Sequence, residues 1–144
     1  MQNQGKAYAH IKGGSGFECL SGKIEFHQSK DGVWVIANVK GLPKNETGFF
    51  ALHIHEGSGC GGKNFSETGS HYNPCNAEHP LHSGDLPPLL SNYGNAYMAV
   101  KTNRFTVSEI IGKTVVIHMN SDDFTSQPAG NAGNKIACGI IKSV

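Results

Sequence analysis

Short runs of apolar or alternating residues recur along the chain and are separated by turn-forming residues. The runs cover residues 7–12, 21–28, 33–39, 49–55, 89–91, 96–102, 114–119 and 135–141. Alternation with a period of two is typical of strands that bury one face. Glycine, proline, asparagine and aspartate fill the gaps, and Asp31-Gly32 is a hairpin signal between the second and third runs. The pattern predicts seven or eight short strands.

Helical periodicity is nearly absent, and only residues 108–112 are expected to make a helical turn. Residues 89–91 and 96–102 flank Asn92-Tyr93-Gly94-Asn95, so we expect them to pair as a further hairpin. Many short strands with frequent turns predict an all-β antiparallel sandwich or barrel. A chain of 144 residues without a repeat or a linker fits one domain, residues 1–144.

Two polar segments interrupt the strand pattern, at residues 56–88 and 121–134. Loops longer than about 12 residues are uncommon in compact domains, and most of them are either functional or disordered. Each of these loops begins just after a predicted strand that carries histidine. That placement favours a functional role.

Composition and charge exclude several classes of function. The formal net charge is +1, so the chain lacks the basic balance of a nucleic-acid-binding protein. No stretch approaches the roughly 18 apolar residues of a membrane span. The first five residues are polar and contain no apolar signal-peptide core. We therefore expect either a cytoplasmic protein or the mature form of an extracytoplasmic one, from the cell envelope or secreted.

The chain contains eight histidines and a single tryptophan, and the spacing of the histidines is informative. His53 and His55 are two apart in a predicted strand, so both side chains point to one face while Ile54 points to the core. Two imidazoles on one strand face can chelate copper or zinc. A short motif of this kind also occurs on polar strand faces that only meet solvent.

The first long loop carries a second group of potential ligands, and these are His71, His79, His82 and Asp85. Three histidines and one aspartate match the four-ligand shell of a tetrahedral zinc site, although a solvated histidine-rich loop is the alternative. His118 ends a β-branched run and on its own would be a satisfied core histidine. In a sandwich, its strand can neighbour the strand of His53.

Five segments together resemble the copper–zinc superoxide dismutases, of the bacterial type. The segments are His53-Ile54-His55-Glu56, Gly69-Ser70-His71-Tyr72-Asn73-Pro74, His82-Ser83-Gly84-Asp85-Leu86, Val116-Ile117-His118 with Asp122-Asp123 behind it, and Gly130-Asn131-Ala132-Gly133-Asn134-Lys135-Ile136-Ala137-Cys138-Gly139. Each is weak alone, but they follow the order of the family. The resemblance implies a Greek-key β-sandwich or flattened immunoglobulin-like barrel with long metal-binding and electrostatic loops.

The same resemblance assigns roles to residues. It implies a copper ion bound by His53, His55, His71 and His118, and a zinc ion bound by His71, His79, His82 and Asp85. His71 then bridges both metals and serves in catalysis, and Asp122 accepts hydrogen bonds from one histidine of each site. The implied reaction disproportionates the small anion superoxide into O₂ and H₂O₂. A non-catalytic copper- or zinc-binding relative, such as a carrier or buffer, is the alternative.

The cysteines and one lysine refine this picture. Four cysteines allow three pairings, and the resemblance implies a disulfide between Cys60 and Cys138, leaving Cys19 and Cys75 either bridged or free. Lys135 stands where the family normally has an arginine that guides the anion, so the charge is kept and the planar fork is lost. Residues 121–134 contain no lysine or arginine, which predicts weaker guidance. The sequence leaves open whether the protein is a monomer or a homodimer.

Overall fold

The computed structural model describes residues 5–144, and residues 1–4 of the polar N-terminal stretch lie outside the described part. One curled sheet has the strand order β5-β8-β9-β1-β2-β3-β7, with β10 beside β1, and every pairing is antiparallel. Its strands are β1 (Lys6–Gly13), β2 (Ser21–Ser29), β3 (Gly32–Lys40), β5 (Leu52–His55), β7 (Ala96–Thr102), β8 (Thr114–His118), β9 (Lys135–Ile140) and β10 (Lys142–Ser143).

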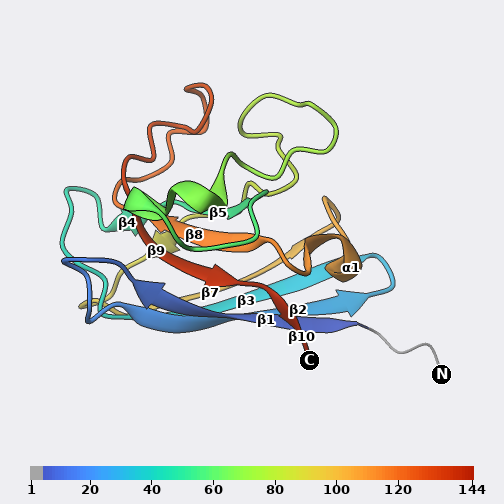
Figure 1. Cartoon of the computed structure of the whole chain (residues 1–144), viewed down its shortest axis with the longest axis horizontal. Helices are drawn as coiled ribbons and strands as arrows, with labels where there is room; N and C mark the ends of the chain where they lie inside the picture. Colours follow the sequence, from blue (N-terminus) through green and yellow to red (C-terminus); the bar gives the residue numbers. More distant parts are fainter. Residues whose placement is uncertain (1–4) are drawn as a thin grey trace.

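The sheet folds over into two layers. Strands β1, β2, β3 and β7 form one layer, and β5, β8 and β9 form the other (Figure 1). Both long loops rise from the second layer, on the side away from the first (Figure 1). The chain crosses between layers from β3 to β5 and from β7 to β8, as in Greek-key folds. The predicted antiparallel sandwich or flattened barrel is thus confirmed.

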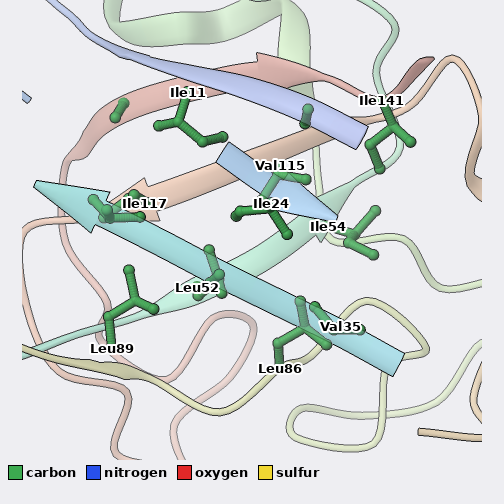
Figure 2. Close-up of a cluster of buried hydrophobic side chains, with 14 of the residues drawn as sticks. Ile11, Ile24, Val35, Leu52, Ile54, Leu86, Leu89, Val115, Ile117 and Ile141 are labelled. Atoms are coloured by element: carbon green, nitrogen blue, oxygen red, sulfur yellow. The ribbon is translucent and has the colours of Figure 1, made fainter. Parts of the chain in front are cut away.

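Alternation along the strands builds the core between the layers. In β3, Val33, Val35, Ala37 and Val39 are buried, while the residues between them are more exposed. Figure 2 shows Val35 in one cluster with Leu52 of β5 and with Val115 and Ile117 of β8. Burying each large apolar side chain stabilises the fold by roughly 1.5–3 kcal/mol. The core therefore fixes which face of β5 and β8 is left for the loops.

One predicted hairpin is wrong. Strand β6 (Leu89–Leu90) does not pair with β7 but with β4 (Phe49–Phe50). In this pairing Phe50 and Leu89 are both completely buried. Because β4 precedes β5 and β6 precedes β7, the small sheet joins the two edges of the large one. The predicted strand over residues 49–55 is therefore split at Ala51.

Besides the strands, the described residues form two short helices. The helix α1 (Val107–Ile110) lies where the sequence predicts a helical turn, and a 3₁₀ helix, η1 (Lys63–Thr68), lies in the first long loop, where the sequence predicts irregular structure. In the part of the chain that the structure describes, no helix is both long and apolar enough to cross a membrane.

Candidate metal centre

Strands β5 and β8 present histidines on the face opposite the core. Ile54 is buried in the core, and His53 and His55 turn to the other face, as the period of two predicts. His118 ends β8 on that same side, and its backbone N–H donates to the carbonyl of Ala51 at 2.9 Å. All three rings are nonetheless buried, because the two long loops cover this face.

Backbone hydrogen bonds attach the first long loop to β5. Tyr72 N donates to Ile54 O, and Ile54 N donates to Gly84 O, both at 2.8 Å. A Cβ at position 84 would lie 2.2 Å from Ile54 O, so only glycine allows this approach. The neighbouring residues His71 and Asp85 are thereby fixed above the strand.

Four imidazoles converge on one point. One ring nitrogen from each of His53, His55, His71 and His118 lies within 4.8 Å of the others. His55 and His118 use their Nδ1 atoms on the carbonyls of Gly69 and Gly133, at 2.9 and 3.2 Å, so their Nε2 atoms face each other at 3.3 Å. A ring that donates from Nδ1 keeps a lone pair on Nε2. Two facing lone pairs fit a cation between them.

A second group of ligand atoms lies on the other side of His71. Its Nδ1 is 2.9 Å from Asp85 Oδ1 and 3.2 Å from His82 Nδ1. His79 Nδ1 and His82 Nδ1 each lie 3.1 Å from Asp85 Oδ2. Bonds of about 2.0–2.1 Å to one ion put tetrahedral ligands roughly 3.3 Å apart, close to these spacings.

His53 also has a ring nitrogen near this second group. His82 fits the fourth position better, because its Nδ1 lies 3.2 Å from His71 Nδ1 and 3.1 Å from Asp85 Oδ2, while His53 already belongs to the first group of four imidazoles.

Asp122 joins the two groups. Its Oδ2 accepts from His53 Nε2 at 2.8 Å and its Oδ1 accepts from His79 Nε2 at 2.7 Å. A carboxylate only accepts, so both rings carry hydrogen on Nε2 and keep a lone pair on Nδ1. The Nδ1 atoms of His53 and His79 and the Nε2 of His71 are buried without a hydrogen-bond partner, since His79 Nδ1 and the nearby Asp85 Oδ2 are both acceptors. Buried polar atoms of this kind are rare, and here a metal ion would satisfy them.

Burial keeps the rings of the first group neutral. It lowers the pKa of His55 to about 2 and that of His118 to about 3, and it also lowers the pKa of His53. Burial alone would raise the pKa of Asp122, but hydrogen bonds from His53 and His79 outweigh it and lower that pKa to about 2. Neutral imidazoles and an ionised carboxylate are the forms that bind metal.

Lys135 lies beside the first group of histidines because of a β-bulge. It pairs with His118 across β8 and β9, and the register shifts between Ile117 and His118. A bulge re-aims side chains, and here Ile136 enters the core while Lys135 lines a pocket. That open pocket has a volume of about 510 Å³, and its lining includes His55, His71 and His118.

A disulfide fastens the first long loop to the sheet. Cys60 is bonded to Cys138 of β9, 78 residues away, as the resemblance implies. Of the alternatives left open for the other two cysteines, the structure has the free form, with Cys19 and Cys75 both exposed.

Sequence reasoning missed two side chains that hold the first loop. The amide of Gln127 pairs with the backbone of His79, accepting from its N–H at 2.9 Å and donating to its carbonyl at 2.7 Å. Arg104 donates to the carbonyl of Pro80 at 2.7 Å. Neither residue belongs to a motif, so no sequence signal pointed to them.

Comparisons with known proteins agree with this geometry. The family model for copper/zinc superoxide dismutase (SODC) matches residues 20–141. Superoxide dismutase [Cu-Zn] 2 of Aquifex aeolicus (strain VF5) is 36% identical, over 84% of this chain and 78% of its own length. Superoxide dismutase [Cu-Zn] of Legionella pneumophila is 34% identical, over 84% of this chain and 77% of its own length.

A solved structure is also similar. The crystal structure of a double mutant of a SOD-like protein from Bacillus subtilis has a TM-score of 0.77 and 27% sequence identity, covering 92% of this chain and 95% of that one. The strand order, the two histidine groups and these matches lead to one conclusion: the chain belongs to the copper/zinc superoxide dismutase family.

Proposed function

We propose that this chain, as one domain over residues 1–144, is a working superoxide dismutase with a copper ion and a zinc ion that share His71. Copper would be held by His53, His55, His71 and His118, and zinc by His71, His79, His82 and Asp85. The observation that carries the proposal is the set of unpaired, buried ring nitrogens that converge on either side of His71. Bound copper supplies one-electron exchange with superoxide, and zinc has no redox chemistry.

His71 contributes through its two nitrogens. Nδ1 belongs to the zinc-side group and Nε2 has no hydrogen-bond partner and faces the copper-side group. The reaction joins two superoxide anions and two protons into O₂ and H₂O₂, so one anion must receive both an electron and protons. Nε2 of His71 can hold such a proton next to the pocket while it is not bound to copper, because its one lone pair serves either the metal or the proton. Asp85 keeps the ring in place from the other side.

Lys135 contributes by attracting the anion. Its ammonium is the single cationic group in the pocket lining, and Glu56 places a carboxyl group in the same lining. A cation in a pocket raises the capture rate of a small anion, and salt screens the effect. Lys135 attracts the anion and the carboxylate of Glu56 repels it, so the capture rate depends on where the ammonium of Lys135 lies in the pocket.

A dismutation assay on protein loaded with copper and zinc tests the proposal. We expect one copper and one zinc per chain and rapid loss of superoxide that depends on copper. Stoichiometric binding of both metals without turnover would instead identify a metal carrier or buffer. Zinc-only protein, prepared in the same way, is the matched control.

The disulfide bears on the compartment. Structural disulfides persist mainly in oxidising compartments. With Cys60 bonded to Cys138, we propose that the protein works in the cell envelope or outside the cell. Fractionation of the source cells, probed with an antibody, tests this placement, and recovery in the cytosol would reject it.

A further inference from the structure

Lys135 lines the pocket beside the histidines, although the flexible side chain of a lysine can adopt many other positions. A lysine ammonium is a compact charge on a flexible four-carbon stem, without the pre-organised fork of arginine. In this structure the ammonium of Lys135 is nevertheless held. Its Nζ donates to Thr68 Oγ1 at 2.7 Å and to Gly69 O at 3.1 Å.

Thr68 is arranged to accept that hydrogen bond. The residue is completely buried, at the end of η1. Its hydroxyl donates its only hydrogen to Phe65 O at 2.7 Å, so its lone pairs are left for Lys135. Because Thr68 cannot move into solvent, it offers the ammonium a fixed acceptor.

The second acceptor ties the ammonium to the metal centre. Gly69 O accepts from Lys135 and also from His55 Nδ1, at 2.9 Å. Two of the three ammonium hydrogens are therefore used, and one remains for the pocket. The ammonium is thus fixed beside the copper-side histidines and does not extend into solvent.

We propose that Thr68 is a positioning residue for anion capture. Its hydroxyl holds the ammonium of Lys135 at the pocket and so replaces the rigidity that an arginine fork would bring. The predicted effect on the dismutation rate rests on the proposed function. The predicted effect on anion binding does not, because it holds for any small anion. Electrostatic attraction weakens with distance and with solvent screening, so a released lysine attracts the anion less well.

Thr68→Val tests the proposal, because valine keeps the shape and removes the hydroxyl. We expect the dismutation rate of metal-loaded protein at low salt to fall roughly 3–10-fold, at or below the lower end of electrostatic steering effects because the charge is displaced and not removed, and to depend less on salt. Thr68→Ser should restore both the rate and its salt dependence. The matched control is Thr114→Val, which removes another buried hydroxyl that donates to a loop carbonyl, that of Gly57 at 3.1 Å. It should keep the parent's salt dependence.

A double-mutant cycle separates positioning from a purely structural role. If Thr68 acts through Lys135, Thr68→Val should have no further effect on the rate in a Lys135→Met background. An equal loss in both backgrounds would overturn the proposal, and so would an unchanged rate in Thr68→Val alone. If Thr68→Val fails to fold, the same cycle is run with Thr68→Ala and Thr68→Ser.

Azide affinity of the copper- and zinc-loaded protein supplies a readout that needs no turnover. We expect azide to bind roughly 3–10-fold more weakly to Thr68→Val than to the parent, and as tightly to Thr68→Ser. If the parent has no dismutase activity but Thr68→Val still binds azide more weakly than the parent, the proposed function is rejected and this inference is kept. A fully active parent with equal azide affinity in Thr68→Val would reject this inference alone.

Discussion

Asp122 offers the sharpest test of how the two metal sites are coupled. Asp122→Asn keeps the size of the side chain and replaces one acceptor oxygen by an NH₂ donor. In the structure both oxygens accept from imidazoles, at 2.8 Å from His53 and 2.7 Å from His79, and Oδ1 also accepts from Phe124 N at 2.8 Å. An asparagine can serve only one of the two rings, because its NH₂ would meet the N–H of the other.

The unserved ring must change its tautomer or lose its hydrogen bond. Moving hydrogen to Nδ1 removes the lone pair that faces the metal. Hydrogen bonds to a charged partner contribute about 1.5–3 kcal/mol, and loss of such a partner typically weakens metal binding about 10–100-fold. We therefore expect a loss of affinity in this range for at least one of the two metals.

Competition titrations with chelators measure both dissociation constants. Asp123→Asn is the matched control, because Asp123 is the exposed neighbour and bonds only within its own loop, to Thr125, Ser126 and Asn131. Equal copper and zinc affinities in Asp122→Asn and Asp123→Asn would refute the reasoning.

Four further predictions follow from named contacts. Lys135→Glu should slow dismutation strongly at low salt and make added salt accelerate it, while Lys135→Arg should keep or modestly raise the rate, and a parent-like rate for Lys135→Glu in a salt series would contradict this. Gln127→Ala removes both hydrogen bonds to the backbone of His79 and should weaken zinc binding about 10-fold in a chelator competition, whereas unchanged binding would make that contact incidental. Reduction of the Cys60–Cys138 disulfide should lower the free energy of unfolding by about 2–4 kcal/mol, measured by denaturant unfolding with and without reductant. Equal free energies of unfolding in the two conditions would contradict a stabilising role of the disulfide. In metal-free protein, burial lowers the pKa of His55 and His118 to about 2 and about 3, so below pH ~6.5 the unfolded chain takes up protons that the folded chain does not. The free energy of unfolding should then fall with pH below that point by up to roughly 1.4 kcal/mol per unit for each ring, and a flat urea-unfolding profile from pH 7 to 5 would exclude this.

The sequence predicts the strands and points to the candidate ligand residues for a local reason. Strand alternation and the His53-x-His55 spacing are properties of neighbouring residues, and a period of two decides which face each side chain takes. The gathering of His71, His79, His82 and Asp85 in one loop is visible in the same way. The structure brings these residues together, and which ion each of them binds stays a prediction.

Features that depend on partners far apart in sequence were not visible. Leu89 and Leu90 pair with β4 instead of β7, and no local pattern encodes that choice. Gln127 and Thr68 look like ordinary polar loop residues, yet they contact backbone and side chains 48 and 67 residues away. The bulge that turns Lys135 toward the pocket likewise has no sequence signal.

The central claim is that His71 is shared by two different ions, and a crystal structure of the copper- and zinc-loaded protein tests it directly. Anomalous diffraction measured at the copper and zinc absorption edges locates each metal separately. We predict a copper peak among His53, His55 and His118, a zinc peak among His79, His82 and Asp85, and the ring of His71 between them. A single peak, or two peaks of which only one contacts His71, would contradict the account.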